Sequence, residues 1–155
     1  MKNNIILVIL LGISVFVDCL PLNDQEEDKS LNAQESEVSA VQKRDILQFS
    51  GMIRCATGRS AWKYFNYGNW CGWGGSGTAV DGVDSCCRSH DWCYKRHDSC
   101  YPKIIPYIAS TSGSHPSCSI TCHSANNRCQ RDVCNCDKVA AECFARNTYH
   151  PNNKH

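Results

Sequence analysis

The stretch Asp84-Ser-Cys-Cys-Arg-Ser-His-Asp-Trp-Cys-Tyr94 places a histidine beside an aspartate and surrounds the pair with cysteines. Read as a helix, Cys86, His90 and Cys93 recur at i, i+4 and i+7 and therefore share one face. Asp91 lies about 100° further around the helix, on the flank of that face. The pattern predicts a hydrolytic histidine and a separate cation-binding carboxylate, both on one helix that disulfides hold in place.

The chain begins with a segment typical of a secretory signal. Lys2 precedes an apolar run from Ile5 to Val17. This run is shorter than the roughly 20 apolar residues that a transmembrane helix needs. We predict a signal peptide over residues 1–20 and a secreted, extracellular protein.

Residues 21–44 are acidic and polar, contain no aromatic residue, and end in Lys43-Arg44. Such a composition cannot bury a core. A Lys-Arg pair is also common on protein surfaces, but its position before a cysteine-rich region favours proteolytic processing. We expect a propeptide over 21–44 and a single mature domain over 45–155.

Cysteine content predicts a disulfide-rich domain. The chain has 13 cysteines, and Cys19 lies in the predicted leader, which leaves an even number for residues 45–155. In a secreted domain this count indicates six disulfides rather than a zinc site. Cross-links would then supply stability that a small core cannot.

Two series of cysteines recur every seven residues, one starting at Cys86 and one at Cys122. A seven-residue repeat returns to nearly the same helix face, so each series marks one stripe on a helix. If two such helices run antiparallel, paired cysteines have residue numbers with a constant sum. That condition selects three bridges, which are Cys86–Cys143, Cys93–Cys136 and Cys100–Cys129.

The same register gives His90 a partner. Asp137 faces a level midway between His90 and Tyr94, roughly 3 Å along the helix axis from each. We therefore expect Asp137 to accept hydrogen bonds from both side chains. This arrangement would orient the imidazole and leave its second nitrogen available as a general base.

A glycine-rich loop, Tyr67-Gly-Asn-Trp-Cys-Gly-Trp-Gly-Gly-Ser-Gly77, precedes the helix. Glycines allow backbone carbonyls to converge, and carbonyls together with a carboxylate suit calcium. A phosphate-binding loop is disfavoured because the GK[ST] ending is absent. Plain turn structure is the remaining alternative at this point.

Together, the loop, the Asp84–Tyr94 stretch and Cys134-Asn-Cys-Asp137 resemble the secreted phospholipase A2 family, in its pancreatic and elapid-like group I branch. The resemblance extends from about Ile46 to Tyr149. It implies a mainly α-helical, disulfide-rich fold. The fold would contain two long antiparallel helices, an amino-terminal helix, a calcium-binding loop and a small β-wing.

The resemblance also implies residue roles. His90 matches the general base, Asp137 its orienting partner and Tyr94 a supporting hydrogen-bond donor. Asp91 matches the carboxylate ligand of Ca²⁺. The remaining implied positions are the carbonyls of Trp70, Gly72 and Gly74 as calcium ligands, the Gly72 amide as an oxyanion donor, and three further bridges, Cys55–Cys118, Cys71–Cys87 and Cys122–Cys134.

This sequence departs from the family pattern at several positions. Asn69 replaces a cysteine, and no cysteine follows Cys143, so one bridge of the branch is missing as a whole. Trp70 replaces a tyrosine, which a carbonyl ligand tolerates. The family's second network tyrosine is expected near Cys118, and Tyr107 stands elsewhere, so we expect the outer hydrogen-bond network to lack it.

Membrane contact is the second predicted layer of function. Residues 45–155 carry 12 Lys and Arg and 8 Asp and Glu. This mild basicity suits an anionic membrane and is too small to indicate nucleic acid. Ile46, Leu47 and Trp73 are the candidate lipid-facing residues, although burial in the core is an equal alternative for Ile46 or Leu47.

These observations predict calcium-dependent hydrolysis of the sn-2 acyl ester of glycerophospholipids at a membrane or micelle surface. The products would be a fatty acid and a lysophospholipid. The alternative is a toxin or receptor ligand on the same scaffold, with a protein receptor as partner and hydrolysis incidental. A biological effect that persists in a His90→Gln variant would favour the ligand or toxin, whereas its loss would favour the enzyme.

Overall fold

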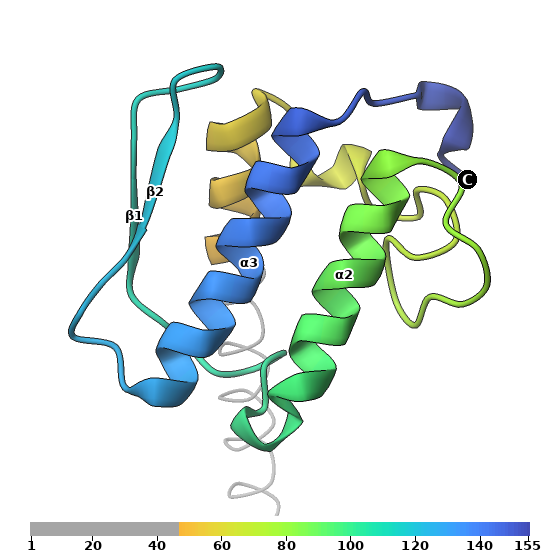
Figure 1. The fold of residues 1–155 in the computed structure, drawn as a ribbon. Coiled ribbons are helices and arrows are strands. Elements are labelled where there is room, and N and C mark those ends of the chain that lie inside the picture. The colour runs from red at the N-terminus through yellow and green to blue at the C-terminus, as the bar shows by residue number, and fades with distance from the viewer. Residues whose placement is uncertain (1–46) are drawn as a thin grey trace, which may run out of the picture. The chain divides into compact units, whose positions relative to one another are not determined.

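Two long antiparallel helices form the centre of the structure (Figure 1). The computed structural model describes residues 47–155, in which α2 spans Gly82–Arg96 and α3 spans Arg128–Arg146. Among these residues no helix is both long and apolar enough to cross a bilayer. The predicted signal peptide, the predicted propeptide and Ile46 lie outside the described residues.

Polar caps determine where both long helices begin. The Asp81 carboxylate accepts a hydrogen bond from the Asp84 amide at 2.9 Å and caps α2. At the start of α3, the Asn127 side chain accepts from the Gln130 amide, and the Gln130 side chain accepts from the Asn127 amide, both at 3.0 Å. Each cap satisfies amide groups that the helix itself leaves unpaired.

Six disulfides hold the described chain together, and they match every pairing that the sequence analysis expected. The Cys86–Cys143 and Cys93–Cys136 bridges join α2 to α3, with Cα–Cα distances of 5.8 and 5.7 Å. The remaining four are Cys55–Cys118, Cys71–Cys87, Cys100–Cys129 and Cys122–Cys134. The helix pair therefore has one register, which the constant-sum argument predicted.

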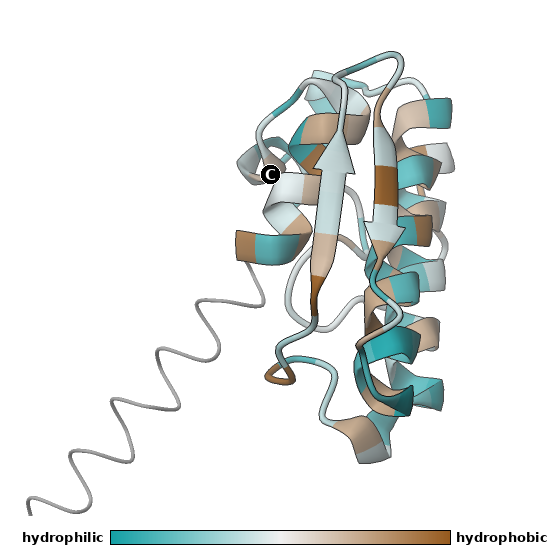
Figure 2. Ribbon diagram, turned by 90° about the vertical axis from the view of Figure 1, so that its left-hand side faces the viewer, coloured by the Kyte–Doolittle hydropathy of each residue, from teal (hydrophilic) through white to brown (hydrophobic). Residues whose placement is uncertain are grey.

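An amino-terminal helix, residues 47–57, packs against this pair and contributes Met52 and Ile53 to the core. The antiparallel hairpin of β1 (Ala109–Ser112) and β2 (Ser119–Cys122) forms the small β-wing on the α3 side (Figure 1). Figure 2 shows that the two strands are mostly pale rather than hydrophobic. Only Ile120 of the eight paired residues is buried, so the hairpin adds little to the core.

The carboxyl-terminal segment closes over the start of the glycine-rich loop. The Gly68 amide donates to the Asn153 carbonyl at 2.7 Å, and the His155 amide donates to the Asn66 carbonyl at 2.9 Å. Lys154 forms a β-bridge with Tyr67. These hydrogen bonds hold the carboxyl-terminal segment against the loop without a disulfide, because the chain lacks one bridge of the group I branch.

Asp81 joins this closure to the helix start. Besides the Asp84 amide, its carboxylate accepts hydrogen bonds from the Tyr67 hydroxyl and from Asn153 Nδ2. Burial alone would raise the pKa of Asp81, but these hydrogen bonds outweigh it and lower the pKa below its ordinary value. The ionised carboxylate is therefore the form that the fold favours.

Replacing Asp81 by Ala should lower the free energy of unfolding by about 2–4 kcal/mol, because the α2 cap is lost and the buried Tyr67 hydroxyl loses its acceptor. Urea unfolding of both proteins measures the difference. Asp98→Ala, at an exposed position, is the matched control and should change stability by less than about 1 kcal/mol.

The effect of Asp81→Ala should also depend on pH. The pKa of Asp81 is lowered in the folded state, so its stabilising contribution is present above the unfolded-state pKa and disappears as pH falls through the folded-state pKa. The difference between the two proteins should shrink below about pH 4. An equal difference at pH 7 and at strongly acidic pH would contradict this account.

Candidate active site

His90 on α2 and Asp137 on α3 face each other across the helix pair. His90 Nε2 lies 2.6 Å from Asp137 Oδ1. The His90 side chain is 13% exposed, whereas that of Asp137 is fully buried. The imidazole is thus accessible from outside, while its partner is protected from water.

Two tyrosines complete the hydrogen bonding of Asp137. The Tyr94 hydroxyl donates to Oδ1 at 2.7 Å, and the Tyr107 hydroxyl donates to Oδ2 at 2.5 Å. A buried carboxylate is costly unless donors compensate it, and here both oxygens are engaged.

The expectation that the second network tyrosine is missing was wrong. Tyr107 lies ahead of the β1–β2 hairpin, and its side chain is buried against Asp137. Its distance in sequence from Cys118 carried no information about its place, because the hairpin folds back between the two residues. The path of the 101–108 segment decides where this hydroxyl points.

The amino-terminal helix forms another wall of the site. The Phe49 ring stacks on the His90 imidazole, with centroids 4.7 Å apart and planes inclined by 18°. On the preceding residue, the Gln48 side-chain amide donates to the Tyr107 carbonyl. This helix therefore positions both the histidine and one of the tyrosines around Asp137.

A second buried carboxylate organises the glycine-rich loop. Asp84 accepts hydrogen bonds from the backbone amides of Asn69, Trp70 and Val80 at 2.9, 2.7 and 2.9 Å. A Cβ atom on Gly68 would lie 2.4 Å from the Asp84 side chain, and Gly68 has φ +59°. Glycine is thus required where the loop passes this carboxylate.

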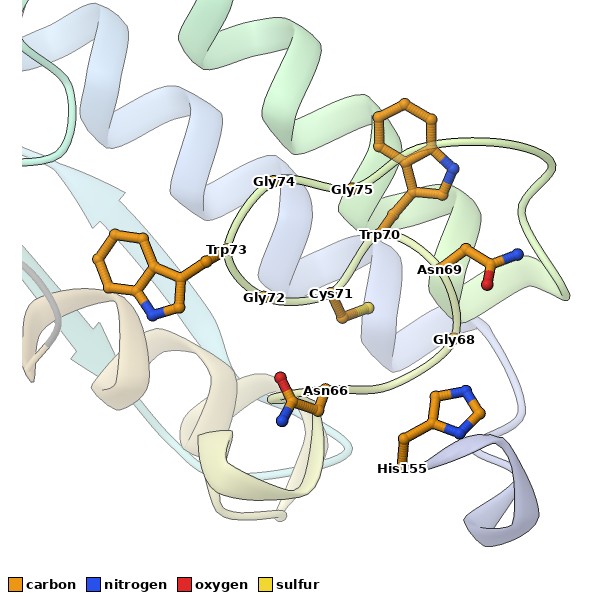
Figure 3. Close-up of a pocket in the computed structure, with 10 residues that line it drawn as sticks. All are labelled: Asn66, Gly68, Asn69, Trp70, Cys71, Gly72, Trp73, Gly74, Gly75 and His155. Carbon is orange, nitrogen blue, oxygen red and sulfur yellow. The ribbon is translucent and has the colours of Figure 1, made fainter.

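Figure 3 shows the loop as an open ring of backbone. Its residues line a pocket with a volume of about 200 Å³. Trp70 and Trp73 point in different directions from the ring, and Trp73 is largely exposed. Gly74, with φ +73°, adopts a left-handed conformation that other residues rarely take. The loop therefore presents backbone groups rather than side chains on its inner side.

Asp91 follows His90 on α2 and is partly buried. Burial raises the pKa of its carboxyl above the ordinary value, although His90, Lys103 and a hydrogen bond from the Gly75 amide act in the opposite direction. Lys103 Nζ also lies 5.5 Å from the centre of the Trp73 ring. The loop, Asp91 and Lys103 are therefore neighbours.

The donor set fits a calcium ion. Asp91 keeps a burial cost that its protein neighbours do not fully offset, and a divalent cation would offset it. Carboxylate and carbonyl oxygens are the ligands that calcium prefers. A cluster of Cys93, His97 and Cys136 also has metal-ligating atoms close together, but its cysteines form a disulfide and offer no thiolate.

Comparison with known proteins identifies the family. The phospholipase A2 family profile matches residues 46–154. The chain is 44% identical over 113 residues to "Basic phospholipase A2" of Micrurus corallinus, covering 71% of this chain and 76% of that protein. It is 46% identical over 110 residues to "Acidic phospholipase A2 DE-II" of Naja melanoleuca, covering 70% and 92%. The chain belongs to the phospholipase A2 family.

Within this phospholipase A2 fold, the structure brings together His90, Asp137 and Tyr94. The glycine-rich loop contains Trp70, Gly72 and Gly74. Its Gly75 amide donates a hydrogen bond to the neighbouring Asp91. Of the residues predicted to face lipid, Leu47 and Trp73 are exposed, by 59% and 73%.

Several residues of the site were missed from the sequence. Asp84 opens the most informative stretch of the chain, and its position just before the cysteine pair was the only available signal. Two others lie on the amino-terminal helix, whose packing against His90 and Tyr107 the helical pattern alone does not specify. Lys103 lies in a segment without a helical repeat. These missed residues are Gln48, Phe49, Asp84 and Lys103.

Replacing Asp84 by Asn should destabilise the protein by about 2–4 kcal/mol, because three backbone amides lose a charged acceptor and the new NH₂ group faces donors. Urea unfolding measures this loss, and amide hydrogen exchange should report faster opening at Asn69 and Trp70. Asp98→Asn, on the exposed surface, is the control. Unchanged exchange in the loop would contradict the role of Asp84.

Replacing Tyr107 by Phe tests the corrected network. The variant leaves Asp137 Oδ2 without this donor, so the free energy of unfolding should fall by about 2 kcal/mol. Tyr101→Phe, in which the mutated ring is 70% exposed, should have no measurable effect in the same chemical unfolding experiment. Equal stability of both variants would show that the Tyr107 hydroxyl contributes nothing.

Proposed function

We propose that the protein catalyses calcium-dependent hydrolysis of the sn-2 acyl ester of glycerophospholipids at a membrane surface, giving a fatty acid and a lysophospholipid. One observation carries the proposal. In a chain of the phospholipase A2 family, a partly accessible histidine bound to a buried aspartate lies next to a carboxylate tied to a glycine-rich loop.

The hydrogen-bond pattern supports His90 as the general base. Because Asp137 engages Nε2, Nδ1 is the nitrogen available to accept a proton. Nδ1 takes a proton from water as its oxygen attacks the sn-2 carbonyl carbon, and it returns that proton to the departing lysophospholipid oxygen. Asp137 stabilises the transient imidazolium, and Tyr94 and Tyr107 hold Asp137 in place.

Four groups form the proposed calcium site, namely the Asp91 carboxylate and the carbonyls of Trp70, Gly72 and Gly74. When bound, calcium would polarise the ester carbonyl and attract the substrate phosphate. The Gly72 amide is the proposed donor to the negative oxygen that develops on the attacked carbonyl. Asp84 supports this set by holding the loop backbone.

Lys103 adds a cation at the rim of the same site. Its closeness to Asp91 and to the Trp73 ring places a positive charge near the path of a phospholipid head group. We assign to Lys103 attraction of the substrate phosphate. Trp73 would contact the lipid surface together with Leu47 and Ile46, since exposed tryptophan favours the membrane interface.

Processing and location are part of the proposal. Removal of the signal peptide 1–20 and of the propeptide 21–44 would release a domain with six disulfides, which suits an extracellular route. Extracellular fluid would also supply calcium. A protein receptor, as in the alternative of a ligand or toxin, remains a prediction, which a biological effect retained without His90 would favour.

Two isosteric substitutions test the catalytic proposal. His90→Gln should lower release of the sn-2 fatty acid from phospholipid vesicles by about 10²–10⁴-fold, because the base is lost, and leave calcium affinity unchanged. Asp91→Asn should lose both calcium affinity and turnover, since the charged ligand is gone. Calorimetric calcium titration and fatty-acid release measure the two effects.

The controls for this test are chelation of calcium from the unaltered protein, which should stop release, and comparison of the melting temperatures. Full activity of either variant, or calcium binding by Asp91→Asn with unaltered affinity, would disprove the assigned roles.

A further inference from the structure

The segment that follows α3 is held to the rest of the protein by noncovalent contacts alone. No cysteine follows Cys143, so no disulfide reaches this part of the sequence. We call residues 149–155 the strap, which includes the short helix η3 (Pro151–Asn153). The strap lies against the start of the glycine-rich loop (Figure 1). Its docking there can therefore be reversible.

Two backbone hydrogen bonds dock the strap on the loop entry. The Gly68 amide donates to the Asn153 carbonyl at 2.7 Å, and the His155 amide donates to the Asn66 carbonyl at 2.9 Å. In Figure 3, His155 lies beside Gly68 at the start of the loop, whereas Trp73 lies on the opposite side. The strap therefore binds the loop just before the carbonyls that are proposed to hold calcium.

Two side chains anchor the strap on either side of this contact. Asn153 Nδ2 donates to the Asp81 carboxylate at 2.8 Å and to the Tyr67 hydroxyl at 3.4 Å. Lys154 Nζ donates to two backbone carbonyls of the 62–65 segment, at 3.1 and 2.6 Å. Both side chains stabilise the docked strap without contributing an atom to the proposed calcium site.

The backbone conformation of the loop entry depends on outside support. Asn66 has φ +55° and Gly68 has φ +59°, so both are left-handed. Residues other than glycine adopt this conformation rarely, and glycine adopts many others with equal ease. Neither residue by itself selects the observed path of the chain. The strap bonds end on these same two residues and select it.

Three consecutive backbone amides fix the chain from Gly68 onward. The strap accepts from the Gly68 amide, and the Asp84 carboxylate accepts from the amides of Asn69 and Trp70. The Trp70 carbonyl is a proposed calcium ligand. Such carbonyls must converge to about 2.3–2.6 Å from the ion. A loosened entry therefore lowers the fraction of molecules in which the loop is ready to bind calcium.

We propose that docking of the strap sets the affinity of the glycine-rich loop for calcium, with Asn153 and Lys154 as positioning residues. When the strap detaches, the loop entry samples other conformations, and part of the binding free energy of calcium is used to order it. The inference rests on the calcium site of the proposed function and adds a noncovalent regulation of that site. Because coupling between two sites is reciprocal, calcium also stabilises the docked strap, by the same factor.

The test measures calcium binding by calorimetry on the disulfide-intact protein, without lipid. The variant Asn153→Ala/Lys154→Met removes both side-chain anchors. We expect it to bind calcium about tenfold more weakly, equivalent to about 1.4 kcal/mol, which is within the usual range of coupling between sites. Removal of a cation would by itself favour binding of a cation, so the change in charge cannot produce this loss.

Two controls separate the strap from a general effect of mutation. Asn152→Ala/Lys95→Met removes the same residue types from an exposed strap position and from α2, where Lys95 contacts Trp92. Ile120→Val alters a buried position of β2 and lowers the melting temperature without touching the strap. Both controls should bind calcium with unchanged affinity.

Hydrogen exchange provides an independent readout of docking itself. In the unaltered protein, saturating calcium should slow exchange of the Gly68 and His155 amides, which donate the two strap bonds, by about tenfold. Amides of the β1–β2 hairpin should exchange at unchanged rates. In Asn153→Ala/Lys154→Met, the Gly68 and His155 amides should exchange faster than in the unaltered protein.

A milder variant covers the case in which the double variant does not fold. Asn153→Ala keeps the Lys154 anchor and should weaken calcium binding by about threefold, as expected for the loss of one set of hydrogen bonds. Asn152→Ala, at the adjacent exposed residue, is its matched control.

Several outcomes would overturn the proposal. Equal calcium affinity of the strap variants and the unaltered protein would overturn the coupling alone, and so would an equal loss in Ile120→Val. Exchange of Gly68 and His155 that does not respond to bound calcium would have the same meaning. Absence of calcium binding by the unaltered protein would overturn the calcium site of the proposed function as well, which distinguishes the two failures.

Discussion

The disulfides between α2 and α3 are the constraint on which the rest of the structure depends. Cys86–Cys143 and Cys93–Cys136 permit one antiparallel register, and that register sets His90 opposite Asp137. In a domain this small, covalent links can hold two helices in a fixed relation that a limited core would hold less firmly. The geometry of the proposed catalytic pair is in this sense a consequence of cross-linking.

Two fully buried aspartates divide the work of positioning the site. Asp137 receives the histidine and two tyrosine hydroxyls, whereas Asp84 receives three backbone amides of the glycine-rich loop. In each case, hydrogen-bond donors compensate the free-energy cost of burying the carboxylate. Asp91 is a third, partly buried carboxylate, and burial raises its pKa although His90, Lys103 and the Gly75 amide act in the opposite direction. A carboxylate whose burial is only partly compensated is suited to holding a cation.

The use of carboxylates as internal anchors also shapes the surface. Asp81 lies at a junction where the α2 start, Tyr67 and the carboxyl-terminal segment meet. Residues 47–80 and 143–155 contain no Asp or Glu, so Lys and Arg are the side chains in them that are always charged. The modest net charge of the domain therefore conceals a strongly uneven distribution, which is the more relevant quantity for contact with an anionic membrane.

The sequence by itself determined the elements in which residues of one type recur at a regular spacing. Seven-residue cysteine spacing determined both long helices, their register, three disulfides and the pairing of His90 with Asp137, because helical geometry converts spacing into position. Resemblance to a known family supplied the residue roles in the glycine-rich loop and the other three bridges. Only the tertiary structure decided the places of Tyr107 and Lys103. Those residues lie in segments without periodicity, where packing between parts of the chain far apart in sequence decides which side chains meet.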